Sequence, residues 1–400
     1  MRIAYLVSQY PAVNHTFILR EIRGLRSQGF EIDIVSVRPP DRPPSAMTVE
    51  ERNELEYTRA IKDISIPGAL GAQTIEFLRR PAGYLGGLFL ALRMGRGSLP
   101  ATFAHLLYFA EAVIAGRWMM ASGYRHFHTH FSSTVALLAA RIFPLTFSIT
   151  IHGPEEFNDV AGFHLSEKVA AARLVVAISS YARSQILRCC PPSQWDKVVT
   201  CRLGVDGAVF EPRPEPAGGT PEILCVGRLA PVKAQHVLIE ALSLLRGRGV
   251  DACLRLVGDG PDRPSLEAAS REMGLTDKVV FDGWRNQDEV RARYRQATLF
   301  AMASFAEGIP VVLMEAMAME IPCVATRIMG IPELIEDGVS GLLAPPADAV
   351  PLADALERLL RDAALRARLG PEGRRRVLGH FDLPANCAIL GALFRQRLTP

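Results

Sequence analysis

Short apolar runs alternate with helical stretches along this chain, and the alternation is the first indication of its fold. The opening run RIAYLVS is followed by a helical stretch over about 17–28 and then by a second apolar run, EIDIVSV. Strand, helix and strand in this order are typical of a parallel sheet with helices on its faces. Further apolar runs return at 146–150, 174–179 and 197–203. We therefore predict a Rossmann-like, doubly wound α/β domain over 1–206.

A helical insertion over about 66–122 interrupts this domain. It is rich in Leu, Ala, Phe and Met and contains scattered arginines, Arg79, Arg80, Arg93, Arg96 and Arg117. Such a composition is typical of an amphipathic region at a membrane surface, but a pair of ordinary packed helices has the same appearance. No uninterrupted apolar run reaches 18 residues and no cleavage pattern follows Met1, so neither a spanning helix nor a secretory signal is predicted.

A proline-rich and glycine-rich stretch separates the two halves of the chain. Residues 207–221, GAVFEPRPEPAGGTP, cannot propagate a helix or a central strand, and we interpret them as a linker. The runs EILCVGR, ACLRLVGDG and VVFDGW then repeat the strand–helix rhythm, which predicts a second parallel-sheet domain over 222–380. The apolar spacing over 381–400 predicts a C-terminal helix that packs back on the first domain.

Composition and charge agree with a folded two-domain protein. The chain has 400 residues, 22% of them charged, and a net charge of +3, which does not indicate a nucleic-acid partner. Its seven cysteines contain no CxxC pair, so neither a disulfide framework nor a zinc site is predicted. Free thiols fit a reducing cytoplasm.

Two acids stand at a predicted junction of loop and helix in the segment EGIPVVLMEAMA. Pro310 suits the first helical turn, which leaves Glu307 in the loop and Glu315 more than one turn inside the helix. The free amides of Val311, Val312 and Leu313 would attract phosphate. Because a carboxylate accepts hydrogen bonds from two neighbouring hydroxyls, one acid suits a hexose and the other a ribose. Alternatively, Glu315 is an exposed helix residue and Glu307 an ordinary loop acid, with no role in binding.

Two cations follow the first strand of the second half in VGRLAPVK. The strand ends at Gly227, and Arg228 and Lys233 come next, at the carboxyl end where open α/β sheets bind ligands. Such cations could neutralise a diphosphate leaving group, whose charge grows in the transition state. Taken alone, the pair could equally be a solvated loop.

Histidines gather in the first half of the chain. His152 closes the run TFSITIHG, a position from which a side chain can enter a cleft, although a buried core histidine is the alternative. His126, His128 and His130 alternate in HFHTHF and would share one face of a strand. Metal binding is the weaker interpretation, because a fourth ligand is missing and no DxD sequence occurs in the chain.

Several motifs together resemble the large retaining glycosyltransferase family 4, which has the GT-B fold. These are VGRLAPVK (226–233), VGDGP (257–261), FDGW (281–284), EGIPVVLMEAMA (307–318) and GIPELIEDGVSGLLAPPAD (330–348). The resemblance extends more loosely to HFHTHF, TIHG and AISSYAR in the first half. It implies an α/β protein with two Rossmann-like domains that face each other across a cleft.

The resemblance also implies roles for individual residues. Arg228 and Lys233 would contact the donor diphosphate, Glu307 the donor sugar and Glu315 the ribose, while His152 would lie near the reacting centre. A packed aromatic residue is an equally good interpretation of Trp284. The remaining implied donor contacts are the turn at Gly227, the backbone of Gly308, Ile309, Pro310, Val311, Val312 and Leu313, and Trp284 or Arg285 beside the base.

The segment SQYPAVNHTFILREI departs from the glycine-rich first loop of most relatives and resembles the colanic-acid and exopolysaccharide branch of the family. His15, Thr16 and Glu21 could face the cleft with His130 and His152 and bind the acceptor. For Thr16, a helix N-cap is an equally good interpretation.

The expected activity is retaining transfer of a hexosyl group (EC 2.4) from a nucleotide-diphosphate sugar to a glycan or lipid-linked acceptor, without metal or cofactor. We expect it in exopolysaccharide or cell-surface glycan biosynthesis, in the cytoplasm or peripherally on the inner face of the cytoplasmic membrane. The alternative is a non-catalytic nucleotide-sugar-binding or assembly protein. A dinucleotide-dependent oxidoreductase is disfavoured because no GxGxxG follows the first strand.

Overall fold

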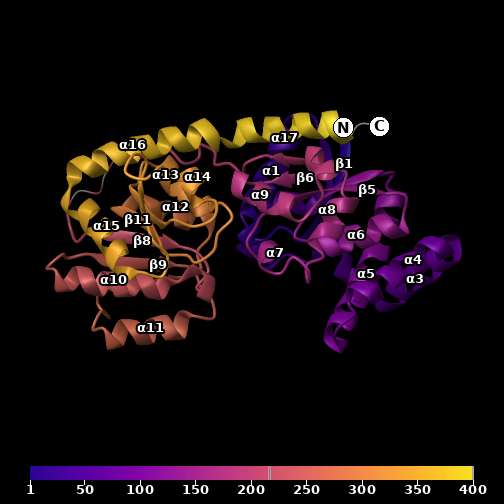
Figure 1. Ribbon diagram of the computed structural model, residues 1–400, viewed down its shortest axis with the longest axis horizontal. Coiled ribbons are helices and arrows are strands. Elements are labelled where there is room, and N and C mark those ends of the chain that lie inside the picture. The colour runs from indigo at the N-terminus through magenta and orange to yellow at the C-terminus, as the bar shows by residue number, and fades with distance from the viewer. Residues whose placement is uncertain (215, 217, 399–400) are drawn as a thin grey trace. The chain divides into compact units, whose positions relative to one another are not determined.

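The computed structural model describes residues 1–214, 216 and 218–398, which form two compact units (Figure 1). Unit 1 comprises Met1–Ile178, Ala182–Cys201 and the chain from Cys387 to the end of the described residues. Unit 2 comprises Ser179–Tyr181 and Arg202–Asn386. The segment predicted as a linker, 207–221, belongs to unit 2, and its residues 215 and 217 lie outside the described residues.

Unit 1 is built on a parallel sheet, and its predicted α/β class is confirmed. The strand order is β3-β2-β1-β4-β5-β6-β7. Every residue of β4 and β6 is buried, as expected for strands covered on both faces. The strands are β1 (Arg2–Gln9), β2 (Glu31–Arg38), β3 (Thr58–Ala60), β4 (His126–His130), β5 (Thr146–Ile151), β6 (Leu174–Ala177) and β7 (Val198–Thr200).

The helices of unit 1 include three long ones in the stretch that the sequence marked as an insertion. Pro81 opens the second of them, and a turn containing Gly95 and Gly97 precedes the third. The helices are α1 (Thr16–Arg26), α2 (Val49–Glu54), α3 (Ile66–Arg79), α4 (Pro81–Met94), α5 (Leu99–Ala121), α6 (Ser133–Ile142), α7 (Glu155–Asn158), α8 (Leu165–Ala171), α9 (Ser180–Arg188) and α17 (Leu383–Leu398). Of these, α9 and α17 each have residues in both units.

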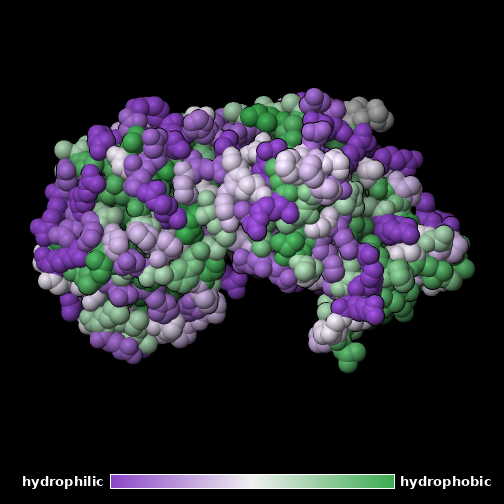
Figure 2. Space-filling view, in the orientation of Figure 1, coloured by the Kyte–Doolittle hydropathy of each residue, from purple (hydrophilic) through white to green (hydrophobic). Residues whose placement is uncertain are grey.

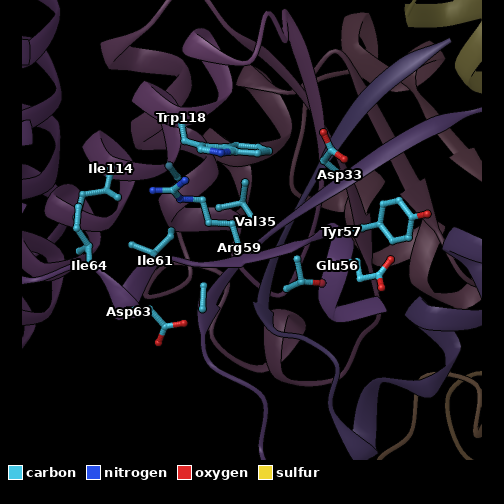
Figure 3. Close-up of a pocket in the computed structure, with 13 residues that line it drawn as sticks. Asp33, Val35, Glu56, Tyr57, Arg59, Ile61, Asp63, Ile64, Ile114 and Trp118 are labelled. Carbon is cyan, nitrogen blue, oxygen red and sulfur yellow. The ribbon is translucent and has the colours of Figure 1, made fainter. Parts of the chain in front are cut away.

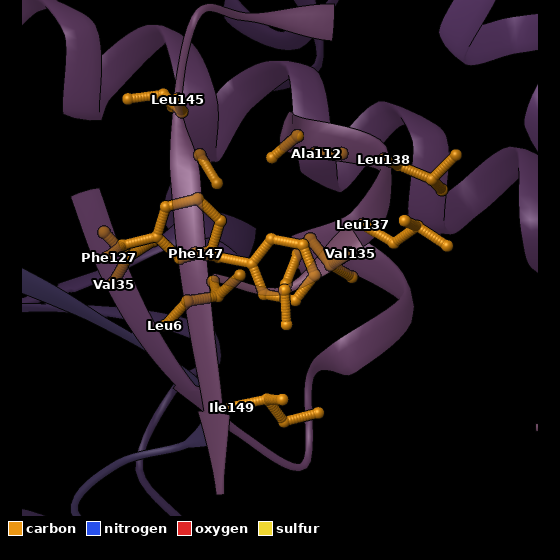
Figure 4. Packing of buried hydrophobic residues seen from close by; sticks show 14 of the residues in the cluster. Leu6, Val35, Ala112, Phe127, Val135, Leu137, Leu138, Leu145, Phe147 and Ile149 are labelled. Atoms are coloured by element: carbon orange, nitrogen blue, oxygen red, sulfur yellow. The ribbon is translucent and has the colours of Figure 1, made fainter. Parts of the chain in front are cut away.

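Two apolar layers cover the faces of the unit 1 sheet. On one face, Phe127 and Phe147 stack at 5.9 Å and pack with Leu6 and the side of α6 (Figure 4). On the other face, α1 and α17 bury Phe394 completely beside Phe30, and Gly24 lets Cys387 approach closely. A Cβ at Gly24 would lie 2.6 Å from the Cys387 sulfur, so α1 and α17 can meet only through a glycine.

Unit 2 repeats the parallel architecture with the strand order β10-β9-β8-β11-β12-β13. Arg374 in α16 holds the chain after Arg202 by donating to the carbonyls of Gly207 and Phe210. The strands are β8 (Glu222–Val226), β9 (Cys253–Val257), β10 (Val279–Gly283), β11 (Leu299–Met302), β12 (Cys323–Thr326) and β13 (Leu342–Ala344). The helices are α10 (Gln235–Gly247), α11 (Arg263–Glu272), α12 (Gln287–Gln296), α13 (Val311–Ala318), α14 (Ile331–Leu334), α15 (Ala349–Arg361) and α16 (Ala363–His380).

Candidate functional site

The carboxyl edge of the unit 2 sheet brings the sequence motifs together. Strand order reverses between β8 and β11, and in open α/β sheets such a reversal leaves a crevice for ligands. Lys233 follows β8 and Glu307 follows β11, so the two flank this position. The backbone links their loops directly, because the Phe305 amide donates to the Val232 carbonyl at 2.8 Å.

Glycines allow the turns at this edge to lie against one another. The Gly227 amide donates to the Val257 carbonyl and the Leu229 amide to the Asp259 carbonyl, which joins the turns after β8 and β9. A Cβ at Gly258 would lie 2.1 Å from the Gly227 oxygen. The glycines of VGDGP therefore allow the backbones of the two turns to approach each other closely.

Lys233 and Glu307 form the central ion pair of this edge. The Lys233 Nζ lies 2.6 Å from the Glu307 Oε1, and the Ser304 hydroxyl donates to the same oxygen at 2.8 Å. Glu307 is only 7% exposed, so its charge is held in a largely buried place where hydrogen bonds are strong. The sequence interpretation assigned the two side chains to separate ligand groups and did not foresee their contact. Ser304 was also missed.

The N-terminus of α13 is open beside this pair, with one change from the prediction. Pro310 is the N-cap and the helix begins at Val311, so the proline stands one position before the first turn. The Leu313 amide is not free, because it donates to the Pro310 carbonyl at 3.2 Å. The amides of Val311 and Val312 have no partner among the described residues and remain able to bind an anion.

Glu315 lies one turn into α13 and is 7% exposed. The buried Tyr294 hydroxyl lies 3.2 Å from its Oε2 and 3.0 Å from the Val312 carbonyl, and it shares its hydrogen between them. The sequence interpretation missed Tyr294, which stands in α12 without a local signal of its role. This contact gives the Glu315 carboxylate a fixed orientation.

The other predicted donor residues lie at the same sheet edge with different exposure. Arg228 is exposed, and its side chain makes no ion pair with any described residue. Trp284 is 44% exposed just beyond β10, and the Arg285 guanidinium lies 3.5 Å from the Glu289 carboxylate. Gly308 lies under Gly330, where a Cβ would come within 2.2 Å of the Gly308 oxygen. The GIPEL segment thus supports the loop that carries Glu307.

The unit 1 sheet has its own strand reversal, between β1 and β4, and histidines line its carboxyl edge. His15 follows β1, Phe131 follows β4 and His152 follows β5. Phe131 stacks against both rings, with centroids 5.0 Å from His15 and 4.6 Å from His152. Phe131 was missed as an individual residue, although it ends the quoted HFHTHF motif.

His15 and Thr16 take different places at the start of α1. The N-cap is His15, not Thr16, and no side chain caps this helix end. Thr16 is the first helical residue and is half-buried. The His15 Nδ1 lies 3.1 Å from the Gln9 carbonyl, which can only accept, so this nitrogen carries a hydrogen. Burial lowers the pKa of His15, which leaves its Nε2 as an acceptor.

His126, His128 and His130 share one face of β4, as the alternation predicted. Two of the rings bind hydroxyls of β5: His126 lies between Thr146 and Ser148, and His128 lies between Ser148 and Thr150. Burial lowers the pKa of His126 to about 3 and that of His128 well below its usual range, so both rings are neutral.

His130 differs from its two neighbours on β4. It contacts His152 through Nδ1 at 2.8 Å and the Glu21 carboxylate through Nε2 at 3.1 Å. Glu21, His128 and His130 could each offer one ligand atom to a metal ion, and these three atoms lie within 4.8 Å of one another. His128, however, already uses both ring nitrogens on hydroxyls, which makes the cluster a poor fit for a metal.

A hollow beside β2 and β3 is separate from these residues (Figure 3). Its lining includes Asp33, Arg59, Ile61 and Trp118, with the Arg59 guanidinium pointing beneath the Trp118 ring. None of the predicted site residues lines it, so we assign it no part in the chemistry.

Comparison with known sequences points to one kind of protein. Residues 220–362 match the family described as glycosyl transferases group 1. The chain is 29% identical over 375 residues to the Escherichia coli protein that carries the name colanic acid biosynthesis glycosyltransferase WcaL, covering 89% of this chain and 90% of that protein. It is 27% identical over 386 residues to the amylovoran biosynthesis glycosyltransferase AmsK of Erwinia amylovora, covering 91% and 92%.

Solved structures share the whole fold at low sequence identity. Anabaena Alr3699/HepE in complex with UDP and glucose superposes with a TM-score of 0.75 at 17% identity, covering 98% of this chain and 99% of that one. The sucrose-phosphate synthase of Thermosynechococcus elongatus gives 0.74 at 21% identity, covering 99% and 98%. At these identities the likeness concerns the fold alone.

Proposed function

We propose that this chain, which has the GT-B fold of glycosyltransferases, transfers a hexosyl group from a nucleotide-diphosphate sugar to a glycan or lipid-linked acceptor. The premise is that its residues 220–362 match the group 1 glycosyl transferases. Its relatives WcaL and AmsK are named for exopolysaccharide biosynthesis, which we propose as the process here. The observation that carries the proposal is the Lys233–Glu307 pair beside the open end of α13.

We assign the donor to the carboxyl edge of the unit 2 sheet. The exposed Arg228, Lys233 and the amides of Val311 and Val312 are suited to the diphosphate, since together they supply two cations and two free donors. Glu307 suits the sugar hydroxyls, and Lys233 holds it in place while no sugar is bound. Glu315 suits the ribose, because Tyr294 orients it and leaves carboxylate oxygen for a diol. Trp284 and Arg285 remain the proposed base contacts.

We propose retention of the anomeric configuration by same-face displacement. A double displacement would need a carboxylate nucleophile close to a second carboxyl group, and the sequence motifs indicate no such pair. The departing diphosphate itself then takes the proton of the acceptor hydroxyl. Arg228 and Lys233 oppose the negative charge that grows on the leaving group, which makes them the main contributors to rate. His152 is placed near the acceptor by this proposal.

The non-catalytic alternative can be tested at Lys233. Replacing Lys233 with alanine removes one preorganised charge and should lower turnover roughly a hundredfold or more. Sugar transfer or slow donor hydrolysis is measured with a panel of UDP- and GDP-sugars. Lys278→Ala is the matched control, because Lys278 is a unit 2 lysine paired with Asp251 away from the sheet edge.

Near-normal turnover of Lys233→Ala would contradict the assignment. Thermal unfolding of both variants with and without donor separates loss of chemistry from loss of folding. A wild-type protein that binds donor without hydrolysing or transferring it would instead support the non-catalytic alternative.

We also propose that the enzyme works in the cytoplasm, at the inner face of the cytoplasmic membrane, which it contacts through α3, α4 and α5. Figure 2 shows hydrophobic residues gathered over α3 and α4 with polar residues at their border. The apolar surface of these helices, hereafter the α3–α5 surface, consists of exposed large side chains: Ile66, Leu70, Phe77, Leu78, Leu85, Phe89, Leu92, Leu99, Phe103, Leu107 and Tyr108. An apolar surface of this extent is rare on a protein that meets only water.

The charges around the α3–α5 surface fit an anionic bilayer. Between residues 64 and 110 the Asp, Glu, Lys and Arg residues are one glutamate, the buried Glu76, and four arginines, Arg79, Arg80, Arg93 and Arg96. Arginine stems can lie along the acyl chains while their charges reach anionic headgroups. A protein that binds the α3–α5 surface would need a surface that is both acidic and apolar. An anionic bilayer has both properties, in its headgroups and its acyl chains.

Among the described residues, α5 is long and apolar enough to cross a membrane. Its inner face, however, packs into the core of unit 1 through Phe109, Ala112, Val113 and Met119. Only its outer stripe is open, with Leu99 87% exposed and Phe103 64% exposed. We therefore propose that α5 lies on the membrane surface and does not span it.

A further inference from the structure

A chain of hydrogen bonds leads from a buried carboxylate to His152 in unit 1. Glu21 in α1 accepts from the Tyr5 hydroxyl at 2.9 Å, and the same oxygen lies 3.1 Å from the His130 Nε2. The His130 Nδ1 in turn lies 2.8 Å from the His152 Nε2. Glu21 is 8% exposed, His130 is fully buried and His152 is 9% exposed, so the chain runs from the core to the carboxyl edge of the sheet.

The strand pairing explains why His130 alone enters such a chain. Each histidine of β4 lies between two positions of β5, and for His126 and His128 these positions carry hydroxyls. A serine or threonine hydroxyl both donates and accepts, so it leaves the ring tautomer open. For His130 the outer position is His152, and Glu21 from α1 contacts its other nitrogen. A carboxylate only accepts, so Glu21 fixes which nitrogen of the His130 ring carries the hydrogen.

The positions of the hydrogens follow from the donors and acceptors. Glu21 accepts at Oε1, which in a neutral His130 ring places the single hydrogen on Nε2 and leaves Nδ1 bare. The bare Nδ1 then requires a hydrogen on the His152 Nε2. The Nδ1 of His152 is left as an acceptor, and it has no hydrogen-bond partner among the described residues. Carboxylates set the tautomer of a partner histidine in this way in other enzymes.

We propose that Glu21 and His130 are positioning residues that hold His152 in its Nε2–H form, so that the His152 Nδ1 presents a lone pair to a hydroxyl of the bound sugar. That the ligand group is a sugar hydroxyl rests on the proposed function, whereas the tautomer of His152 does not. His15 provides a second acceptor nitrogen on the other side of Phe131, because its Nδ1 is engaged by the Gln9 carbonyl. Two neutral imidazoles with bare nitrogens suit a ligand rich in hydroxyl donors.

The surroundings of His152 hold the ring in this orientation. Phe131 stacks on it at 4.6 Å, and Phe17 lies at 4.9 Å with a tilted ring. Burial and the neighbouring His130 and His15 keep the pKa of His152 well below its ordinary value, so the ring stays neutral. A neutral imidazole has a single ring hydrogen, and the position of that hydrogen decides whether the open nitrogen donates or accepts.

The tautomer can be measured directly on protein labelled with ¹⁵N-histidine. Long-range ¹H–¹⁵N spectra at about pH 8, above the ordinary pKa of an imidazole, distinguish a protonated from a bare ring nitrogen. His130→Asn and His152→Asn identify the two sets of resonances. We expect both rings in the wild type to carry hydrogen at Nε2 and to have a bare Nδ1. A hydrogen on the His152 Nδ1 would overturn the proposal.

Variants separate positioning from mere stabilisation. Glu21→Ala should leave His152 in a mixture of tautomers, whereas Glu21→Gln should preserve the wild-type form, because its amide oxygen can still accept from both donors. Tyr5→Phe is the control, since it removes the other bond to Glu21 and leaves the His130 contact in place. The same His152 spectrum in Glu21→Ala and Tyr5→Phe would contradict the proposal.

The kinetic consequence provides a second measurement. Glu21→Ala should lower kcat/KM for transfer about tenfold, the size of one lost hydrogen bond, and Glu21→Gln should restore most of it. If the wild type transfers no sugar, the proposed function is contradicted, whereas the spectra still test the tautomer of His152. Wild-type transfer together with the wrong tautomer would overturn only the positioning role.

Discussion

Burial sets the protonation of several single side chains on the carboxyl edge of the unit 1 sheet. It lowers the pKa of His15 and His152, and it acts in the opposite direction on the acid Glu156. In each case removal from water disfavours the charged form. The edge therefore consists mainly of neutral hydrogen-bonding groups, in contrast to the charged edge of unit 2 around Lys233 and Glu307.

Glu156 provides a test of this effect in stability. Its Oε2 accepts from the Gly153 amide at 3.0 Å, and burial raises its pKa to about 7 against opposition from that bond and from Lys168. A raised folded-state pKa means that the native state holds the proton longer than the unfolded chain, so stability contributed by this group falls as pH rises from about 4.5 to about 7.

We therefore expect Glu156→Gln to match the wild type near pH 5 and to exceed it by roughly 2 kcal/mol above about pH 7. Denaturant unfolding at several pH values measures the difference between the two proteins. The buried histidines also contribute to the pH dependence, but they are present in both proteins and cancel in the difference. A difference that does not change with pH would contradict the raised pKa.

At the scale of elements, the buried helix α13 differs from the exposed helices α3, α4 and α5 in the surface that it offers to a ligand or partner. The eight-residue α13 is almost wholly buried after its first turn, and only its N-terminus is open. The helices α3, α4 and α5 instead bury one stripe each and leave the other stripe apolar and exposed. A surface helix of a soluble protein normally carries polar residues on its outer stripe, so the apolar exposed stripes call for a partner outside the chain.

The membrane proposal predicts how the α3–α5 surface responds to mutation. A triple variant, Phe89→Ser, Leu99→Ser and Phe103→Ser, removes three large side chains that are 70%, 87% and 64% exposed. Its binding to phosphatidylglycerol-containing vesicles should fall at least about tenfold relative to the wild type, because buried apolar area drives interfacial binding. Co-sedimentation measures the bound fraction.

The matched control replaces Val209, Val350 and Ile389 with serine, since these are also exposed and lie outside the α3–α5 surface. It should bind vesicles like the wild type. Wild-type binding should also weaken on vesicles of phosphatidylcholine alone and at high salt, because the arginines are screened. Equal binding by the two triple variants would refute the membrane contact, and a changed oligomeric state without vesicle binding would indicate a second copy as the partner.

At the scale of the whole molecule, both units have the same plan. Each is a parallel sheet with one strand reversal, and each has its candidate site residues at the carboxyl edge near that reversal. In unit 2 these groups are cations, acids and a helix N-terminus, and in unit 1 they are histidines around an aromatic ring. On the proposed function, the charged edge binds the donor and the neutral edge binds hydroxyls.

This division predicts that the whole enzyme needs no divalent metal. In the proposed mechanism, Arg228, Lys233 and the α13 amides supply the positive charge that a metal ion gives a diphosphate leaving group in other enzymes. Transfer should therefore persist after dialysis against EDTA, measured beside a mock dialysis without chelator. Activity that is lost and returns only with Mg²⁺ or Mn²⁺ would contradict the prediction, and metal analysis of the dialysed protein would show whether any ion is retained.

Most of the fold was predictable because its signals are local. The α/β class followed from short apolar runs, and Gly227 marked a strand end within its own motif. The start of α1 was harder: Thr16 has the chemistry of an N-cap, yet His15 takes that position without a side-chain cap. Pro310 likewise stands one residue before the helix that it was expected to open. Such boundaries depend on surrounding contacts that a local pattern does not contain.

The sequence by itself determined the two parallel sheets and the residue types at their carboxyl edges, since hydrophobic periodicity and strand-end glycines act over a few residues. Only the tertiary structure decided the partners. Lys233 meets Glu307 across 74 positions of chain, and His130 meets Glu21 across 109. Such pairs form where strands and helices from distant segments converge, and their geometry is set by packing of the entire unit. That convergence turns separate acids, cations and histidines into oriented groups.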